Sequence, residues 1–285
     1  MKSTIHQQIR GVIYKIYRLL FPIAYQLFAI MMAKSARFRS FIAQPRDPRN
    51  SVYAKIFYKL HWEWWQRRPY SSELYKVWQK GYWSTVGASR WIEVDDYDYV
   101  DTKQLLMRTL LASDCSLLEL GCGRGVNLEF INQTFPHLKI CAIDASDVMC
   151  KVARNRVPNA QVFCGFYGPE APVLPFSSFD LVFARSTLTY VDETDIESVL
   201  RWVFEKAVRC VVISEPSGEL DQTLIQTSGL RIVEIKPGVY KRLHDHTHIR
   251  DYSEYVIRLQ LPFAMKESTL ERNKGNRMYV FARVN

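Results

Sequence analysis

From about residue 100 onward, short apolar runs alternate with stretches of helical periodicity. Such runs between polar turns are typical of strands buried on both faces. They occupy residues 117–120, 139–143, 161–164, 179–184, 210–213 and 232–235. Helical spacing fills the intervening segments at 101–111, 127–135, 146–156, 195–206 and 223–229. This order of elements indicates repeated strand–helix–strand units.

The first 43 residues carry a helical pattern only. Large apolar residues form one broad face, at Ile5, Ile9, Val12, Ile13, Ile16, Leu20, Ile23, Leu27, Ile30 and Met31. The uncharged stretch 19–33 has fifteen residues, whereas a membrane-spanning helix needs about twenty. We therefore expect residues 1–43 to form a basic amphipathic helix. It either lies in a membrane interface as an anchor or packs on protein, and a true span is disfavoured.

Residues 44–99 are predicted to be a linker followed by helices rich in aromatic residues. Two prolines and alternating charges in residues 44–50 break any helix there. The segment that follows interleaves Tyr and Trp with Lys and Arg. Such a pattern suits stacking on nucleic-acid bases or sugar rings, and it equally suits a helical cap over a ligand.

The net charge of +9 comes from the N-terminal part of the chain. Residues 1–90 hold 16 Lys and Arg against 3 acidic residues, a net +13, and the remainder holds 22 against 26, a net −4. This asymmetry favours a negatively charged partner for the first segment. The candidates are an anionic membrane surface contacted by residues 1–49 and nucleic acid.

Composition favours a globular protein in a reducing compartment. A chain of 285 residues with 48% apolar content supports one large domain with an extension. The six cysteines contain no C-x-x-C pair, and several fall in predicted strands. They are expected to be reduced packing residues in the cytosol, with no disulfide or zinc framework.

The run LLELGCGRG places a glycine turn directly after the first strand. Gly121, Gly123 and Gly125 leave no side chain between the backbone and a ligand, and the amides of the turn face whatever occupies it. Asp144, at the tip of the next strand, is suited to accept hydrogen bonds from both hydroxyls of a ribose. Glu119 adds a second acid. The pattern predicts a nucleoside site.

The spacing separates two classes of cofactor. Dinucleotide sites use G-x-G-x-x-G, but position 126 is Val. The run E-L-G-C-G-R-G followed by Asp144 resembles the first two motifs of the class I S-adenosylmethionine-dependent methyltransferases. The alternatives are a glycine turn without a ligand and a degraded dinucleotide site.

The resemblance covers about residues 100–285. It implies an α/β, Rossmann-like seven-stranded sheet whose last strand, near 278–284, is antiparallel. It also implies an insertion at about 237–276 and S-adenosyl-L-methionine as the cofactor.

The resemblance also implies which residues bind. The expected cofactor-binding residues are Glu119, Gly121, Cys122, Gly123, Gly125, Asp144, Ala145, Phe166, Arg185 and Ser186. Many family members carry an adenine-binding acid after the third strand, and Phe166 is expected to offer an aromatic wall instead. Family members usually cap the substrate with elements before the first strand, so we favour a cap for residues 44–99. The expected substrate-binding residues are Tyr82, Trp83, Arg185, Tyr190 and Arg250.

Methyl transfer from a sulfonium needs alignment and exclusion of water rather than a covalent nucleophile. A hydroxyl acceptor would gain from a general base, and histidine suits this role. The run HDHTHIR supplies His246, His248 and Arg250 as candidate catalytic residues, His248 and Arg250 being preferred. The histidines could instead bind metal or lie in a solvated loop, and no further ligand set is evident, so no metal is expected.

The sequence thus predicts a cytoplasmic methyltransferase, peripheral at the inner face of a membrane or free of it. Its acceptor is expected to be a small-molecule or lipid-linked saccharide methylated on a hydroxyl. The run T-H-I-R-x-Y-S resembles a segment of methyltransferases in glycan and small-molecule pathways. An RNA methyltransferase with a basic N-terminal arm is the first alternative, although no Asn-Pro-Pro-Tyr or Pro-Cys motif marks a nucleic-acid base methylase. The second is a cofactor-binding scaffold without turnover.

Overall fold

The computed structural model describes residues 23, 100–216, 232–236, 239–242, 247–270 and 276–284. Apart from residue 23, all of these belong to the compact unit Arg90–Asn285. The expected amphipathic helix at 1–43 and the aromatic-rich cap at 44–99 lie outside the described residues, so both remain predictions.

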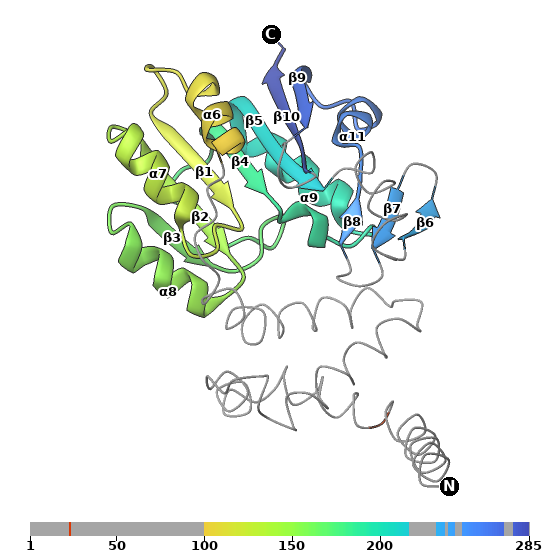
Figure 1. Ribbon diagram of the computed structural model, residues 1–285, viewed down its shortest axis with the longest axis horizontal. Coiled ribbons are helices and arrows are strands. Elements are labelled where there is room, and N and C mark those ends of the chain that lie inside the picture. The colour runs from red at the N-terminus through yellow and green to blue at the C-terminus, as the bar shows by residue number, and fades with distance from the viewer. Residues whose placement is uncertain are drawn as a thin grey trace, which may run out of the picture. The chain divides into compact units, whose positions relative to one another are not determined.

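A seven-stranded sheet forms the centre of this unit (Figure 1). Its strands are β1 (Ser116–Leu120), β2 (Lys139–Asp144), β3 (Gln161–Cys164), β4 (Phe179–Arg185), β5 (Ala207–Pro216), β9 (Phe263–Leu270) and β10 (Asn276–Arg283). The order across the sheet is β3-β2-β1-β4-β5-β10-β9. β1 to β5 run parallel, and β10 is antiparallel to both of its neighbours. The predicted Rossmann-like sheet with an antiparallel last strand is confirmed.

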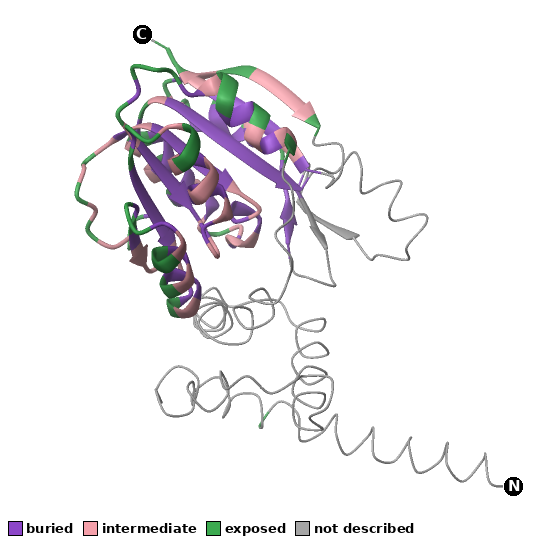
Figure 2. Cartoon of the chain, turned by 60° about the vertical axis from the view of Figure 1, so that its left-hand side comes forward, coloured by how far each residue is buried: buried purple, intermediate pink, exposed green. Residues whose placement is uncertain are grey.

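Helices cover both faces of the sheet. One face carries α6 (Val100–Thr109), α7 (Val126–Thr134) and α8 (Asp147–Arg156), and the other carries α9 (Ile196–Lys206) and α11 (Tyr252–Arg258). Neighbouring strand residues point to opposite faces, so Leu117 packs in the first layer and Leu118 in the second. Figure 2 shows the central strands buried, the edge strand β9 mostly half-buried or exposed, and exposed residues on the outer sides of the helices.

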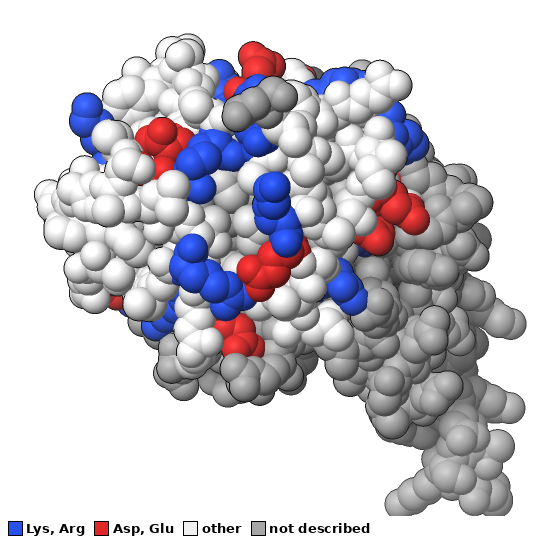
Figure 3. All heavy atoms as spheres, turned by 90° about the horizontal axis from the view of Figure 1, so that it is seen from above, with Lys and Arg blue, Asp and Glu red and all other residues white. Residues whose placement is uncertain are grey.

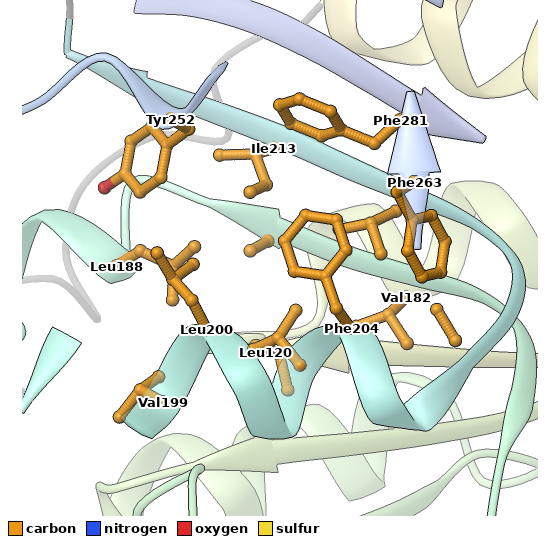
Figure 4. Packing of buried hydrophobic residues seen from close by; sticks show 14 of the residues in the cluster. Leu120, Val182, Leu188, Val199, Leu200, Phe204, Ile213, Tyr252, Phe263 and Phe281 are labelled. Atoms are coloured by element: carbon orange, nitrogen blue, oxygen red, sulfur yellow. The ribbon is translucent and has the colours of Figure 1, made fainter. Parts of the chain in front are cut away.

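The layer under α9 is the larger of the two apolar layers and joins α9, α11, the segment after β4 and strands of the sheet. Phe204 of α9 packs edge to face on Phe263 and Phe281, with ring centroids 4.9 and 5.5 Å apart. Leu188 and Tyr252 reach the same cluster from the segment after β4 and from α11 (Figure 4). The segment after β4 is therefore anchored in the core rather than lying on the surface.

The sixth predicted strand lies in a different sheet. Residues 232–236 form β6 (Ile232–Lys236), which pairs with β7 (Val239–Arg242), and β7 pairs with β8 (His248–Ile249). The prediction that 232–235 supplies a strand of the central sheet was wrong. β9 takes that place from within the range expected to be an insertion. β9 pairs with β10, the next strand along the chain, and this pairing attaches it to the edge of the central sheet.

The face of the described part of the chain that is seen from above is mixed in charge. Seen from above, basic and acidic side chains are interspersed rather than gathered in one basic patch (Figure 3). Ion pairs such as Arg108 with Glu267 and Arg209 with Asp114 join separate elements. Within the described ranges, no helix combines the length and the apolar character needed to cross a membrane.

Candidate functional site

The turn between β1 and α7 is closed on one side and open on the other. The Gly121 N–H donates to the Ile143 carbonyl of β2 over 2.7 Å. A Cβ on Gly121 would lie 2.1 Å from Thr187 Oγ1, so no side chain fits there. A Cβ on Gly123 would meet no atom within 4 Å, at a φ of 53° that favours glycine. The open side at Gly123 is where a ligand can approach the backbone.

The Asp144 carboxylate lies at the end of β2, against this turn. One oxygen accepts from the Gly123 N–H over 2.8 Å and the other from the Ser146 N–H over 2.9 Å. Burial raises the pKa of Asp144, and the two N–H groups offset part of this effect. Each carboxylate oxygen can accept more than one hydrogen bond, so the group keeps capacity for further donors.

Glu119 and Asn127 hold two buried acceptors behind the turn. Asn127 Nδ2 donates to Glu119 Oε1 over 2.8 Å. Glu119 Oε2 and Asn127 Oδ1 are buried and have no hydrogen-bond partner. Burial raises the pKa of Glu119 to about 8, against the hydrogen bond from Asn127. Two orphaned acceptors in one place call for a donor, and a ligand cation would satisfy both.

The segment after β4 borders the turn from the other side. Arg185 Nε donates to Thr102 Oγ1 of α6 over 3.0 Å. Ser186 has a φ of 49°, donates its N–H to the Ser214 carbonyl and accepts from Asn276 Nδ2 over 3.1 Å. Tyr190 ends the short 3-10 helix η1 (Leu188–Tyr190) and is half-buried. These side chains lie at the carboxyl ends of parallel strands, where ligands of such folds bind.

Comparison with known proteins agrees with this geometry. Residues 117–207 match the family model described as a methyltransferase domain. An uncharacterized methyltransferase of Schizosaccharomyces pombe is 38% identical over 189 residues, which are 60% of this chain and 72% of that protein. The chain belongs to the class I S-adenosylmethionine-dependent methyltransferases. The predicted family, enzyme class and cofactor are thereby confirmed.

More distant relatives share the core of this methyltransferase. The trans-aconitate 2-methyltransferase of Paracidovorax citrulli is 33% identical over 88 residues, 31% of this chain and 34% of that enzyme. Among solved structures, magnesium protoporphyrin IX methyltransferase from Synechocystis PCC 6803 with bound SAH has a TM-score of 0.58 at 13% identity. That match covers 73% of this chain and all of the other, and it shows a shared fold.

The residues of the methyltransferase fit its cofactor. S-adenosylmethionine supplies a methyl group on a sulfonium, together with ribose hydroxyls and an ammonium group. The cofactor would approach the backbone of the turn on its open side, at Gly123. Asp144 would accept hydrogen bonds from the ribose hydroxyls. Glu119 Oε2 and Asn127 Oδ1, both buried and unpartnered, would accept from the ammonium.

Four other predicted cofactor residues lie in the described part of the chain. Gly125 begins α7 at a φ of 79°, and a Cβ there would lie 3.2 Å from Ala153 of α8, so this glycine serves packing. Cys122 is buried, which raises the pKa of its thiol. Ala145 lies between Asp144 and Ser146, the N-cap residue of α8. Phe166 follows β3 and is half-buried. Their contacts with the cofactor stay predictions.

Glu119 should make the stability of the methyltransferase depend on pH. The pKa of Glu119 is about 8 in the folded protein, against an ordinary 4.5. The contribution of the protonated carboxyl group to the free energy of unfolding is therefore fully present below pH 4.5 and is lost as the pH rises through 8. Glu119→Gln is therefore expected to gain about 4 kcal/mol of unfolding free energy relative to the native chain between pH 5 and pH 9. Denaturant titrations at both pH values measure this, and a difference that stays constant with pH would contradict it.

Glu215 is a buried residue whose role the sequence did not reveal. Its carboxylate, at the end of β5, accepts from the N–H groups of Thr187 and Leu188, each over 2.8 Å, and of Thr189 over 3.3 Å. Burial raises the pKa of Glu215 to about 7, against these bonds. The available signal was an acid at the end of an apolar strand, where a charge needs partners.

His248 and Arg250 reach the same segment from the second sheet and beyond it. His248 Nδ1 lies 3.3 Å from the Thr189 carbonyl oxygen. The guanidinium of Arg250 is buried and donates to Glu193 and to the carbonyls of Leu188 and Val191. These contacts hold Arg250 in the protein interior, and its binding of a substrate anion stays a prediction.

Three predicted residues lie outside the described residues, namely Tyr82, Trp83 and His246. In the part of the chain that the structure describes, no three His, Cys, Asp or Glu side chains are grouped to hold a metal ion.

Proposed function

We propose that this methyltransferase transfers the methyl group of S-adenosylmethionine to a hydroxyl of a small saccharide, free or lipid-linked. The observation that carries the proposal is the position of His248 beside the segment after β4. A carbonyl oxygen can only accept, so the contact of Nδ1 with the Thr189 carbonyl puts the imidazole proton on Nδ1. In its neutral form the ring would then carry its basic lone pair on Nε2. A base of this kind supports methylation of a hydroxyl, which must lose its proton.

Carboxylate methylation is the second candidate, and the relatives favour it. Several trans-aconitate 2-methyltransferases match the core of this chain. Each match covers about a third of this chain and about a third of the relative. A carboxylate is already ionised at neutral pH, so its methylation needs no base. The two candidates therefore differ in their need for His248.

A transfer assay with radiolabelled S-adenosylmethionine separates the two candidates. The acceptors are a panel of saccharides and glycolipid precursors and a panel of di- and tricarboxylic acids. Mild alkali releases methanol from methyl esters and leaves methyl ethers intact. Alkali-stable label on a saccharide supports the proposal, and alkali-labile label on an acid replaces it with the second candidate.

His248→Gln is expected to lower hydroxyl methylation by about 10²-fold or more, since a general base contributes about 10² to 10⁴. Glutamine can still donate to the Thr189 carbonyl, so the segment keeps this contact. His137→Gln, on an exposed loop, is the matched control and should leave the rate unchanged. Equal rates for the His248 variant and the native enzyme would remove the base from the mechanism.

We also propose that residues 1–49 bring the enzyme to an anionic membrane surface. The support is the excess of basic residues and the apolar helical pattern in that part of the sequence. Co-sedimentation of the full chain and of a chain lacking residues 1–49 with phosphatidylserine vesicles tests this. Binding that needs residues 1–49 supports the proposal. Salt-sensitive binding to RNA in its place would favour the nucleic-acid alternative.

A further inference from the structure

The segment Thr187–Glu193 is held by opposite charges at its two ends. At its amide end, one carboxylate, that of Glu215, satisfies three N–H groups at the start of η1. The start of a helix leaves such N–H groups without intrahelical partners, and a negative charge there is favourable. Glu215 is 1% exposed, so its carboxylate is shielded from bulk solvent.

At the carbonyl end, Arg250 takes the complementary role. Its guanidinium donates to the Leu188 carbonyl over 3.1 Å and to the Val191 carbonyl over 2.7 Å. Its Nε donates to Glu193 over 2.9 Å, and Glu193 also accepts from the Tyr255 hydroxyl of α11 over 2.6 Å. A planar guanidinium offers donors in several fixed directions, which lets one side chain bridge these groups.

The same segment touches the cofactor turn. Thr187 Oγ1 occupies the space that a side chain on Gly121 would need, with 2.1 Å between the two positions. The Tyr167 hydroxyl, from the loop after β3, donates to the Thr187 carbonyl over 2.7 Å and lies 2.9 Å from Thr187 Oγ1. A shift of the segment therefore shifts the wall against which the glycine turn is packed.

The contacts at the far side come from residues between β5 and β9. The Thr189 hydroxyl donates to the His248 carbonyl over 2.7 Å, and Arg250 follows β8 directly. The central sheet is complete without β6, β7 and β8. The second sheet thus has a physical connection to the cofactor turn that passes through Thr187–Glu193.

We propose that Glu215 and Arg250 are positioning residues for methyl transfer, which hold the segment Thr187–Glu193 against the glycine turn and so connect the second sheet with the cofactor site. Neither residue needs to touch the reacting atoms. Two charged groups buried at a single segment are costly unless their partners are well arranged, and here they make six hydrogen bonds with it, three accepted by Glu215 and three donated by Arg250. Removing Glu215 would leave buried N–H groups of the segment without an acceptor, and removing Arg250 would leave its carbonyl groups and Glu193 without this donor.

The test compares Glu215→Gln, Arg250→Lys and Arg250→Met with the native chain. Asp114→Asn is the matched control, because Asp114 is a buried carboxylate that accepts from a backbone N–H and pairs with Arg209. Calorimetric titration with S-adenosylhomocysteine, at a temperature equally far below the melting point of each variant, measures cofactor-site affinity. Hydrogen exchange at the amides of residues 187–189 measures the segment itself.

We expect Glu215→Gln and Arg250→Met to weaken S-adenosylhomocysteine binding by about tenfold, the effect of about 1.4 kcal/mol, and to speed exchange at residues 187–189. Arg250→Lys keeps the charge and should restore part of the affinity. Asp114→Asn should lower the melting point and leave the affinity unchanged. If the Glu215 and Arg250 variants behave like Asp114→Asn, their role is structural only and the proposal fails.

The pH profile gives a readout that a purely structural role would not move. The charged or titratable groups that influence Glu215 are Arg185, Tyr167 and Tyr252. Glu119 and Asp144 titrate in the same site but are present in both proteins. The S-adenosylhomocysteine affinity of the native chain, measured relative to that of Glu215→Gln, should therefore fall as the pH drops through about 7 and Glu215 becomes protonated. A difference that is flat with pH overturns the proposal. No acceptor enters these measurements, so they stand whether or not the acceptor class is correct.

Discussion

Gly123→Ala is expected to reduce S-adenosylmethionine affinity by about 100-fold or more while the protein stays folded. The Cβ would meet no protein atom within 4 Å, so it would project into the space left for the cofactor. The positive φ of 53° adds a folding cost of about 1 to 2 kcal/mol for a non-glycine residue. Calorimetric titration with S-adenosylmethionine measures the affinity, and thermal unfolding measures the cost.

Gly168→Ala separates backbone strain from the blocked cofactor site. Gly168 also has a positive φ, of 117°, and a Cβ there would lie 3.0 Å from Val199 of α9. This control is expected to destabilise the protein at least as much and to bind the cofactor normally. Equal affinities for the two variants would show that Gly123 does not face the cofactor.

Asp144→Asn is expected to cost about 100-fold in S-adenosylmethionine affinity, or about 3 kcal/mol. Each oxygen of Asp144 accepts from a backbone N–H, so an amide nitrogen at either position would face a donor. The single remaining oxygen would then be the only acceptor for the ribose hydroxyls, and it would carry no negative charge. Titration with S-adenosylmethionine measures the loss.

Asp180→Asn is the matched control for this variant. Asp180 also accepts from backbone N–H groups, those of Cys115 and Ser116, but at the start of β4, where the chain enters the sheet. Its replacement should lower the melting point and leave cofactor binding intact. A cofactor affinity that falls equally in both variants would mean that Asp144 acts through stability alone.

The cofactor side of the site was predictable because its signals are local. Gly121, Gly123 and Asp144 belong to one strand–helix–strand unit, in which spacing along the chain fixes the arrangement in space. The role of Glu215 was not predictable in this way. The amides that it accepts from lie 26 to 28 residues earlier, and nothing in the sequence near Glu215 marks them.

The acceptor side was harder for the same reason. Arg250 was expected to bind substrate because its run resembles a segment of other methyltransferases and a guanidinium can bind an anion, yet its partners in the structure lie 57 to 62 residues away in the segment after β4. β9 was missed for another reason: it is an edge strand with polar residues along much of its length, and its pairing with β10, the next strand along the chain, is what attaches it to the central sheet. For Arg250, long-range partners rather than residue type decided the outcome.

The position of β10 between β5 and β9 also bears on how the protein is made. On the ribosome, β1 to β5 can pair with one another as they emerge, but among the described strands the outer edge of β5 has no sheet partner until residues 276–283 have been synthesised. An open strand edge of this kind invites pairing with other chains. The nascent enzyme therefore has a period of exposure that ends only with its last strand, and a chaperone that shields the β5 edge would favour its correct assembly.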